Sequence, residues 1–178
     1  MIRSRALPLG LIIGLLGLPV VAGELDAFVA ASDGAISCWS RFYDAGHLGQ
    51  HPQQTVTEMR FAVGYVAERG DYSSMYWFAL SSQQRGGVAG FTTGTCTPEC
   101  EAMRCGVDCD GGGVVVNSRN AGNVLLDLKD YGYIRMFSAC GTESEEASFN
   151  LEAGLDDKEF LLRPMTGPRC EAMRPDWL

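Results

Sequence analysis

The two histidines of the chain, His47 and His51, have the side chains best suited to metal or acid–base chemistry. At this spacing both imidazoles would lie on one side of a helical turn. With Asp44 they form a donor set of the kind that zinc, copper or nickel accepts. The same residues also fit a simpler role, in which Asp44 caps a short helical connector and Pro52 ends it. Because Pro52 biases His51 away from helical dihedrals, the pair is a weak candidate metal site.

Seven cysteines supply the other reactive side chains. In an oxidising compartment cysteines pair as disulfides, and an odd number leaves one thiol over. The four cysteines between residues 96 and 109 are too evenly spaced for a structural zinc site, which separates two cysteine pairs by a longer stretch. Among the pairings that the sequence allows, we predict three bonds and one free thiol: Cys38–Cys170, Cys96–Cys105 and Cys109–Cys140, with Cys100 left over.

A thiol enzyme would need a cysteine activated by a neighbouring base. If Cys100 is unpaired, His47 or His51 is the available base, but the carboxylates of Glu99 and Glu101 oppose formation of a thiolate. The sequence contains neither the Gly-x-Ser-x-Gly motif of serine hydrolases nor the His-Glu-x-x-His motif of zinc proteases. A serine–histidine pair assembled by the fold stays open.

The N-terminal residues have the order of a secretory signal peptide. Arg3 and Arg5 precede an apolar run from Leu7 to Leu18, and the small residues Ala22 and Gly23 follow it. We predict a signal peptide over residues 1–23, cleaved after residue 22 or 23, and a single disulfide-stapled β domain over residues 24–178. The mature protein is expected in the periplasm or secreted, where its cysteines would oxidise.

Composition argues against several classes of partner. The net charge is −8, and the only lysines are Lys129 and Lys158. Nucleic acids and anionic membranes are recognised by clustered basic residues, so neither is an expected partner. No later stretch approaches the roughly 18 apolar residues of a spanning helix, so no membrane insertion is expected after signal removal. No cofactor is expected, and the partner is an unknown small ligand or an envelope protein.

Period-two alternation predicts that strands carry most of the mature chain. Between Thr55 and Val66, for example, Met59, Phe61 and Val63 alternate with polar or small residues. Further strands are predicted at Ile36–Phe42, Ser74–Leu80, Val88–Cys96, Met103–Asp108, Val114–Ser118, Asn123–Leu128, Tyr133–Ser138 and Glu159–Arg163. Most connections are short and rich in Gly, Asn and Asp, as in antiparallel hairpins. We therefore predict an all-β fold, an antiparallel barrel or sandwich of about eight strands, stapled by disulfides.

Two connections are longer. The segment Tyr43–Pro52 is the predicted short helical connector, and the acidic stretch Gly141–Lys158 is predicted as a loop.

Aromatic residues gather on and just before the strand Ser74–Leu80. Both faces of this strand are apolar, and only one can point into a single core. We therefore predict that the other contributes to a ligand-facing surface. The predicted ligand-binding residues are Tyr72, Tyr76, Trp77 and Phe78. The alternative is that these side chains fill the interior, as in many small barrels.

Two parts of the chain resemble a group of exported bacterial proteins with no assigned activity. They are Cys38–Leu48 with His51–Val56, and Cys105–Gly113. The resemblance covers most of the mature chain and implies neither a substrate nor catalytic residues.

Taken together, the sequence predicts an exported, non-catalytic binding module of the cell envelope that holds a small apolar ligand or a protein partner. Two alternatives are a small hydrolase or thiol enzyme using His47 or His51, and a purely structural envelope protein.

Overall fold

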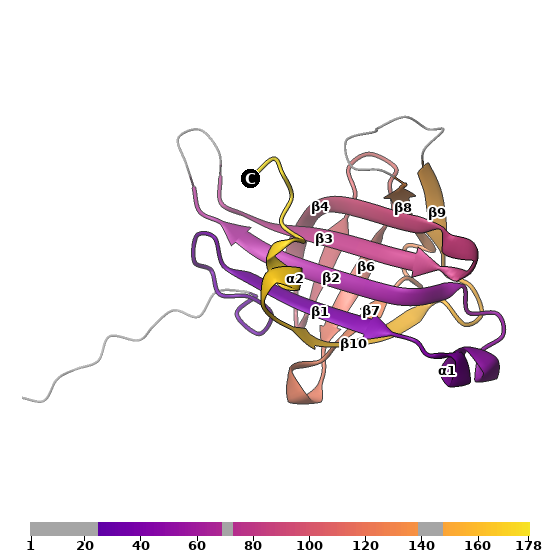
Figure 1. Cartoon of the computed structure of the whole chain (residues 1–178). Coiled ribbons are helices and arrows are strands. Elements are labelled where there is room, and N and C mark those ends of the chain that lie inside the picture. Colours follow the sequence, from indigo (N-terminus) through magenta and orange to yellow (C-terminus); the bar gives the residue numbers. More distant parts are fainter. Residues whose placement is uncertain (1–24, 69–72, 139–147) are drawn as a thin grey trace, which may run out of the picture.

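The computed structural model describes residues 25–68, 73–138 and 148–178 (Figure 1). Its strands are β1 (Ile36–Phe42), β2 (Val56–Val66), β3 (Met75–Gln84), β4 (Ala89–Glu99), β5 (Ala102–Gly106), β6 (Gly113–Ser118), β7 (Val124–Asp127), β8 (Tyr133–Phe137), β9 (Ser148–Glu152) and β10 (Glu159–Met165). The helices are α1 (Ala45–Gln50) and α2 (Pro168–Glu171), with 3₁₀ turns η1 (Arg85–Gly87) and η2 (Asn120–Gly122).

All strand pairs are antiparallel, and eight of the strands close into a barrel in the order β3-β2-β1-β10-β7-β6-β5-β4. Pairing of β3 with β4 completes the ring. The second half of β4 pairs with β5, whereas its first half reaches β8 through the Phe91–Phe137 pair. The hairpin β8–β9 therefore extends the sheet beyond the ring. The predicted all-β antiparallel fold is confirmed, in its barrel form.

Turn chemistry fits the predicted hairpins. In η1, which joins β3 to β4, Gly86 and Gly87 have φ angles of 82° and 85°. These left-handed values are ones that glycine adopts without a steric penalty. The Gln-Arg-Gly-Gly sequence thus forms the tight turn that its composition predicts.

One contiguous apolar cluster occupies the barrel interior. The predicted inward face of β2 is fully buried at Met59, Phe61 and Val63. The Phe61 ring centroid lies 6.1 Å from that of Trp39 and 6.1 Å from that of Phe78, so aromatic rings from β1, β2 and β3 meet inside the ring of strands. Side chains in mutual contact, with almost no exposed area, fill this interior.

A second, smaller cluster lies on the outer face of β1, β2 and β3. There Trp77 packs under the C-terminal segment, against Cys170 and Met173. A Cβ atom at Gly64 would lie 2.2 Å from the Trp77 ring, so this glycine makes the close approach possible. The strand Ser74–Leu80 is apolar on both faces because the barrel core covers one face and the C-terminal segment covers the other.

Two elements were not predicted from the sequence. Strand β9 lies inside Gly141–Lys158, so the prediction of one long loop there is wrong for Ser148–Glu152. Helix α2 follows Gly167 and begins with Pro168, a pairing typical of a helix start. Elsewhere the strands differ from the predicted ranges mainly at their ends, where local sequence specifies structure least.

Two of the predicted disulfides are present, Cys38–Cys170 and Cys96–Cys105. Cys100 is a free, exposed thiol, as predicted. Cys109 is also a free, exposed thiol, and its predicted partner, Cys140, lies outside the described residues, so that pairing stays a prediction. The two bonds are consistent with an oxidising, exported location. Within the described ranges, no helix is both long and apolar enough to cross a membrane.

Candidate functional site

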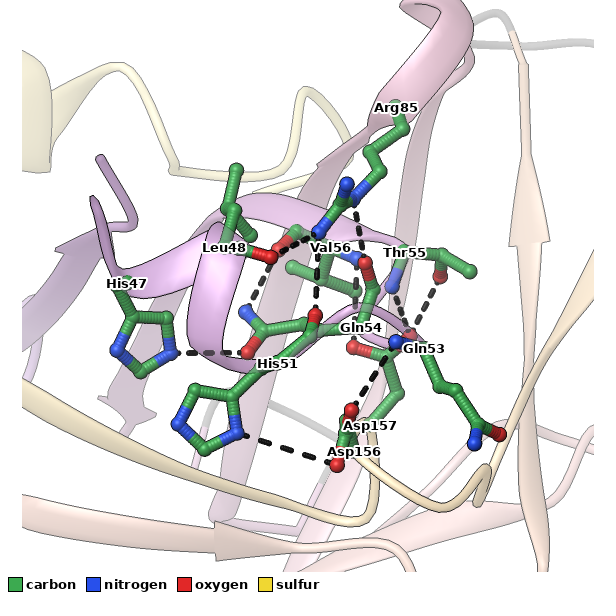
Figure 2. Close-up of polar contacts among 10 residues, drawn as sticks. All are labelled: His47, Leu48, His51, Gln53, Gln54, Thr55, Val56, Arg85, Asp156 and Asp157. Atoms are coloured by element: carbon green, nitrogen blue, oxygen red, sulfur yellow. Dashed lines mark hydrogen bonds and ion pairs between the residues drawn. The ribbon is translucent and has the colours of Figure 1, made fainter. Parts of the chain in front are cut away.

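The candidate site is a polar cap at the α1 end of the barrel, formed by His47, His51, Gln53, Gln54, Thr55, Arg85, Asp156 and Asp157 (Figure 2). The local fold of its first part follows the sequence. Asp44 Oδ1 accepts a hydrogen bond from His47 N at 2.9 Å and caps α1. His51, which precedes Pro52, has non-helical dihedrals and ends the helix. The predicted helical connector is therefore confirmed.

The two imidazole rings stack, with centroids 4.4 Å apart and planes at 22°. Figure 2 shows that each ring directs one nitrogen to a different partner. His47 Nε2 donates to Gln54 Oε1 at 3.0 Å, and His51 Nδ1 lies 3.9 Å from Asp156 Oδ1. Gln54 is itself held, because its Nε2 donates to Val56 O at 2.8 Å. These nitrogens therefore serve contacts with other residues of the polar cap.

The described residues do not place a third metal ligand beside His47 and His51 in a suitable arrangement. Among the residues that the structure describes, no three or more His, Cys, Asp or Glu side chains are grouped to hold a metal ion. Two imidazoles alone make a weak site, since stable protein sites for zinc use three or four protein ligands.

Asp157 joins the β9–β10 connection to the start of β2. It is 3% exposed and accepts hydrogen bonds from Thr55 N at 2.6 Å, Thr55 Oγ1 at 2.6 Å and Val56 N at 3.3 Å. Three donors thus satisfy a buried carboxylate that would otherwise be costly to desolvate.

Arg85 joins the β3–β4 turn to the same connector. Its guanidinium donates to the carbonyl oxygens of Leu48 at 2.8 Å, His51 at 3.1 Å and Gln54 at 2.7 Å. The sequence pattern did not indicate Arg85 and Asp157, because their partners come from distant segments, and it gave no signal for Gln54, although the side-chain partners of Gln54 are His47 and Val56. The sequence pattern that could have indicated Asp157 is the pair Asp156-Asp157, which lies just before the predicted strand Glu159–Arg163. The polar cap is a rigid tie between three parts of the chain.

Tyr43 lies beneath the cap. Its ring is 4.7 Å from that of His47 and 6.4 Å from that of Phe160. Burial raises the pKa of Tyr43 from 10.0 to about 12; the positive charge of Arg41 acts in the opposite direction, and the negative charge of Asp157 adds to the increase.

This shift predicts a pH dependence of stability. The folded protein keeps the phenol proton between pH 10 and pH 12, where the unfolded chain loses it. The protonated Tyr43 phenol therefore makes its full contribution to the free energy of unfolding below pH 10. About 2–3 kcal/mol of this contribution is lost as the pH rises from 10 through 12. We expect urea unfolding between pH 9 and pH 12 to show a steeper loss of stability for the wild-type protein than for Tyr43→Phe. Parallel curves for the two proteins would contradict this assignment.

The predicted aromatic ligand surface is not present as one surface. Trp77 and Phe78 are both fully buried, on opposite faces of β3, and Tyr76 is partly buried with its ring 5.0 Å from that of Tyr65. Tyr72 lies outside the described residues. The apolar pattern of this strand reflects two covered faces rather than exposure to a ligand.

The alternative in which His47 or His51 activates the Cys100 thiol gains no support from the geometry. Arg85, which contacts His51 O, precedes β4, whereas Cys100 follows its last residue, Glu99. At about 3.3 Å per residue, the length of β4 separates the thiol from the histidines by far more than a hydrogen bond.

Two depressions on the molecule are open to solvent, with volumes of about 270 and 420 Å³. The smaller one lies between β2, β3, β4 and β8, and its lining includes Glu58, Arg60 and Phe137. The larger one lies beside the Cys38–Cys170 bond and includes Met165 and Gly122. Neither brings a histidine of the polar cap together with another reactive side chain.

No protein-family model matches the sequence, and searches of the curated proteins and of the solved structures likewise give no match.

Proposed function

We propose that the protein is an exported, non-catalytic binding module of the cell envelope, periplasmic or secreted, and that its partner is another protein. Export is supported by the charged, apolar and small-residue order of residues 1–23 together with two disulfides. The Cys100 thiol is not needed for this role.

The filled barrel interior is the observation that favours a protein partner over a small apolar ligand. Small barrels that hold a ligand leave space among the inward side chains, whereas here Trp39, Phe61 and Phe78 meet inside the ring. An apolar ligand would have to displace this packed core. Binding on the outer surface requires no such change, and Phe42 and Leu161 are 70% and 43% exposed there.

A non-catalytic role fits the polar cap. The side chains of His47, Gln54 and Arg85 are engaged in bonds that fix the connector, including those of Arg85 to three carbonyl groups. Such an arrangement supports a rigid platform for recognition, since rigid surfaces lose little conformational entropy on binding.

The test is native mass spectrometry of the full chain, expressed with its leader and purified from its own compartment. We expect a mass that lacks residues 1–22 or 1–23 and carries no bound apolar molecule. A His47→Gln/His51→Gln double variant should cross-link to the same partner protein as the wild type. A stoichiometric lipid-like ligand, or a partner lost in the double variant, would refute the proposal.

A further inference from the structure

Strand β9 forms the margin of the sheet. The strands of the barrel each have at least two neighbours, whereas β9 pairs with β8 and with no other strand of the described ranges. Figure 1 places β9 on the outside of the sheet, beyond β8. A closed barrel has no free strand edge, so the hairpin β8–β9 supplies an edge that the barrel lacks.

This edge is held firmly in place. The β8–β9 register runs unbroken from Tyr133–Glu152 to Phe137–Ser148. Leu151 is 2% exposed, and the Phe149 ring packs where Gly90 leaves room, since a Cβ atom there would lie 2.6 Å from it. The hairpin is thus packed onto the barrel rather than projecting freely.

The hydrogen-bond pattern shows which groups face outward. Ala153 N donates to Gly132 O at 2.7 Å. These two residues lie opposite each other just beyond the ends of β8 and β9, so they form a hydrogen-bonded pair of the ladder. Bonded and non-bonded pairs alternate in an antiparallel ladder, which makes Arg135–Asn150 a non-bonded pair. Arg135 N agrees with this, because it turns away from β9 and donates to Gly111 O at 2.8 Å.

The main-chain N–H and C=O groups of Asn150 therefore point away from β8, into the free edge. The N–H of Glu152 points the same way, while its C=O accepts from Gly154 N. Within the described residues, neither Asn150 group nor the Glu152 N–H has a partner. Alternating N–H and C=O groups of this kind are complementary to the backbone of another extended strand.

The residues from Phe149 to Glu152 carry none of the features that usually block such pairing. Natural edge strands are commonly protected by proline, lysine or a bulge, and Ser148–Glu152 contains none of these. The charge of the region selects among partners. Glu152 is exposed at the end of the strand, and the chain as a whole has a net charge of −8.

We propose that the β9 edge binds an extended, positively charged segment of a partner protein as an additional antiparallel or parallel strand. This inference rests on the proposed function as a protein-binding module and names the surface and the chemistry of the partner. Main-chain bonds to Asn150 and Glu152 supply the pairing, and Glu152 together with the net negative charge of the chain favours a basic segment over a second copy of this acidic chain.

The test compares Asn150→Pro with Asn150→Ala in the full chain. Proline removes the outward N–H without removing a bond to β8, whereas alanine keeps it. The probe is a fluorescent peptide of about eight alternating lysine and valine residues, measured by fluorescence anisotropy. We expect wild-type protein and Asn150→Ala to bind it equally and Asn150→Pro to bind about tenfold more weakly, the equivalent of one lost hydrogen bond in a desolvated pair.

Peptide controls keep the test independent of how Asn150→Pro folds. A version N-methylated at alternate amides cannot complete a strand, and a glutamate–valine version has the wrong charge; both should bind the wild-type protein at least tenfold more weakly. Equal binding of the methylated peptide would overturn the proposal, as would no binding of the lysine peptide.

Sedimentation in the absence of peptide provides a further check. A dimer that Asn150→Pro abolishes would assign the edge to a second copy and overturn the proposed occupant. A partner protein that still cross-links to Asn150→Pro would refute the β9 site while leaving the protein-binding function intact. An apolar ligand found inside the barrel would refute that function whatever the peptide result.

Discussion

Replacing Cys38 and Cys170 together with alanine is expected to lower the free energy of unfolding by about 3–5 kcal/mol. The bond joins residues that are 132 positions apart, so its loss frees a very long loop in the unfolded chain. It also fastens α2 beside Trp77, and loosening this segment exposes an apolar patch on the outer face. Guanidinium unfolding under non-reducing conditions, followed by tryptophan fluorescence, measures the change.

The second disulfide and a free thiol are matched controls. Cys96–Cys105 spans only 9 positions, so its double alanine variant should lose about 2 kcal/mol less. Cys100→Ala removes no bond and should stay within about 0.5 kcal/mol of the wild type. If the Cys38/Cys170 variant proved no less stable than the Cys96/Cys105 variant, the loop-closure account would fail.

Asp157→Ala is the other substitution with a large expected effect, a loss of about 3–4 kcal/mol. It removes the acceptor for two main-chain N–H groups, of Thr55 and Val56, and for the Thr55 hydroxyl. Val56 is fully buried, so its N–H cannot simply turn to water, and each buried donor left unpaired costs about 1–3 kcal/mol. Urea unfolding at neutral pH gives the value.

The neighbouring carboxylate is the natural control. Asp156 is partly exposed and accepts one main-chain bond, from Gln53 N at 3.1 Å. Asp156→Ala should therefore cost less than about 1 kcal/mol. Equal losses for the two variants would show that burial of Asp157 is not the source of its stabilising effect.

The all-β fold was predictable because the alternation of apolar and polar residues is a local signal: successive side chains of a strand point to opposite faces of the sheet. In β2 every second side chain enters the core, so Met59, Phe61 and Val63 mark the strand and its inner face. The connector was equally readable, because a capping aspartate and a following proline act on their own neighbours. A closed barrel rather than a sandwich depends on the pairing of β10 with β1 and with β7, which no short segment encodes.

Strand β9 was missed because its signal is short and sits among acidic residues. Within Ser148–Glu152 the inward positions Phe149 and Leu151 are the whole apolar pattern. Its pairing with β8 decides its structure, and tertiary context of this kind overrides weak local preference.

The candidate site was predictable only in part. The histidines and Asp44 act within one turn of helix, so their mutual placement followed from spacing. Asp157 and Arg85 act across sequence separations of 102 and 34 residues, at Thr55 N and His51 O. The prediction of a ligand-facing surface on β3 failed for a related reason. The sequence shows that Trp77 is apolar but does not show that the C-terminal segment covers it.

The ring of strands closes between β1 and β10, near the two ends of the chain. Pairing of β1 with β10 joins segments that are far apart in the sequence, and contacts of this kind form more slowly than those within a hairpin. Cys96 can meet Cys105 as soon as their hairpin forms. Cys38 precedes every other cysteine of the chain, so a non-native bond to any of the cysteines before Cys170 has to be exchanged before the Cys38–Cys170 bond can form.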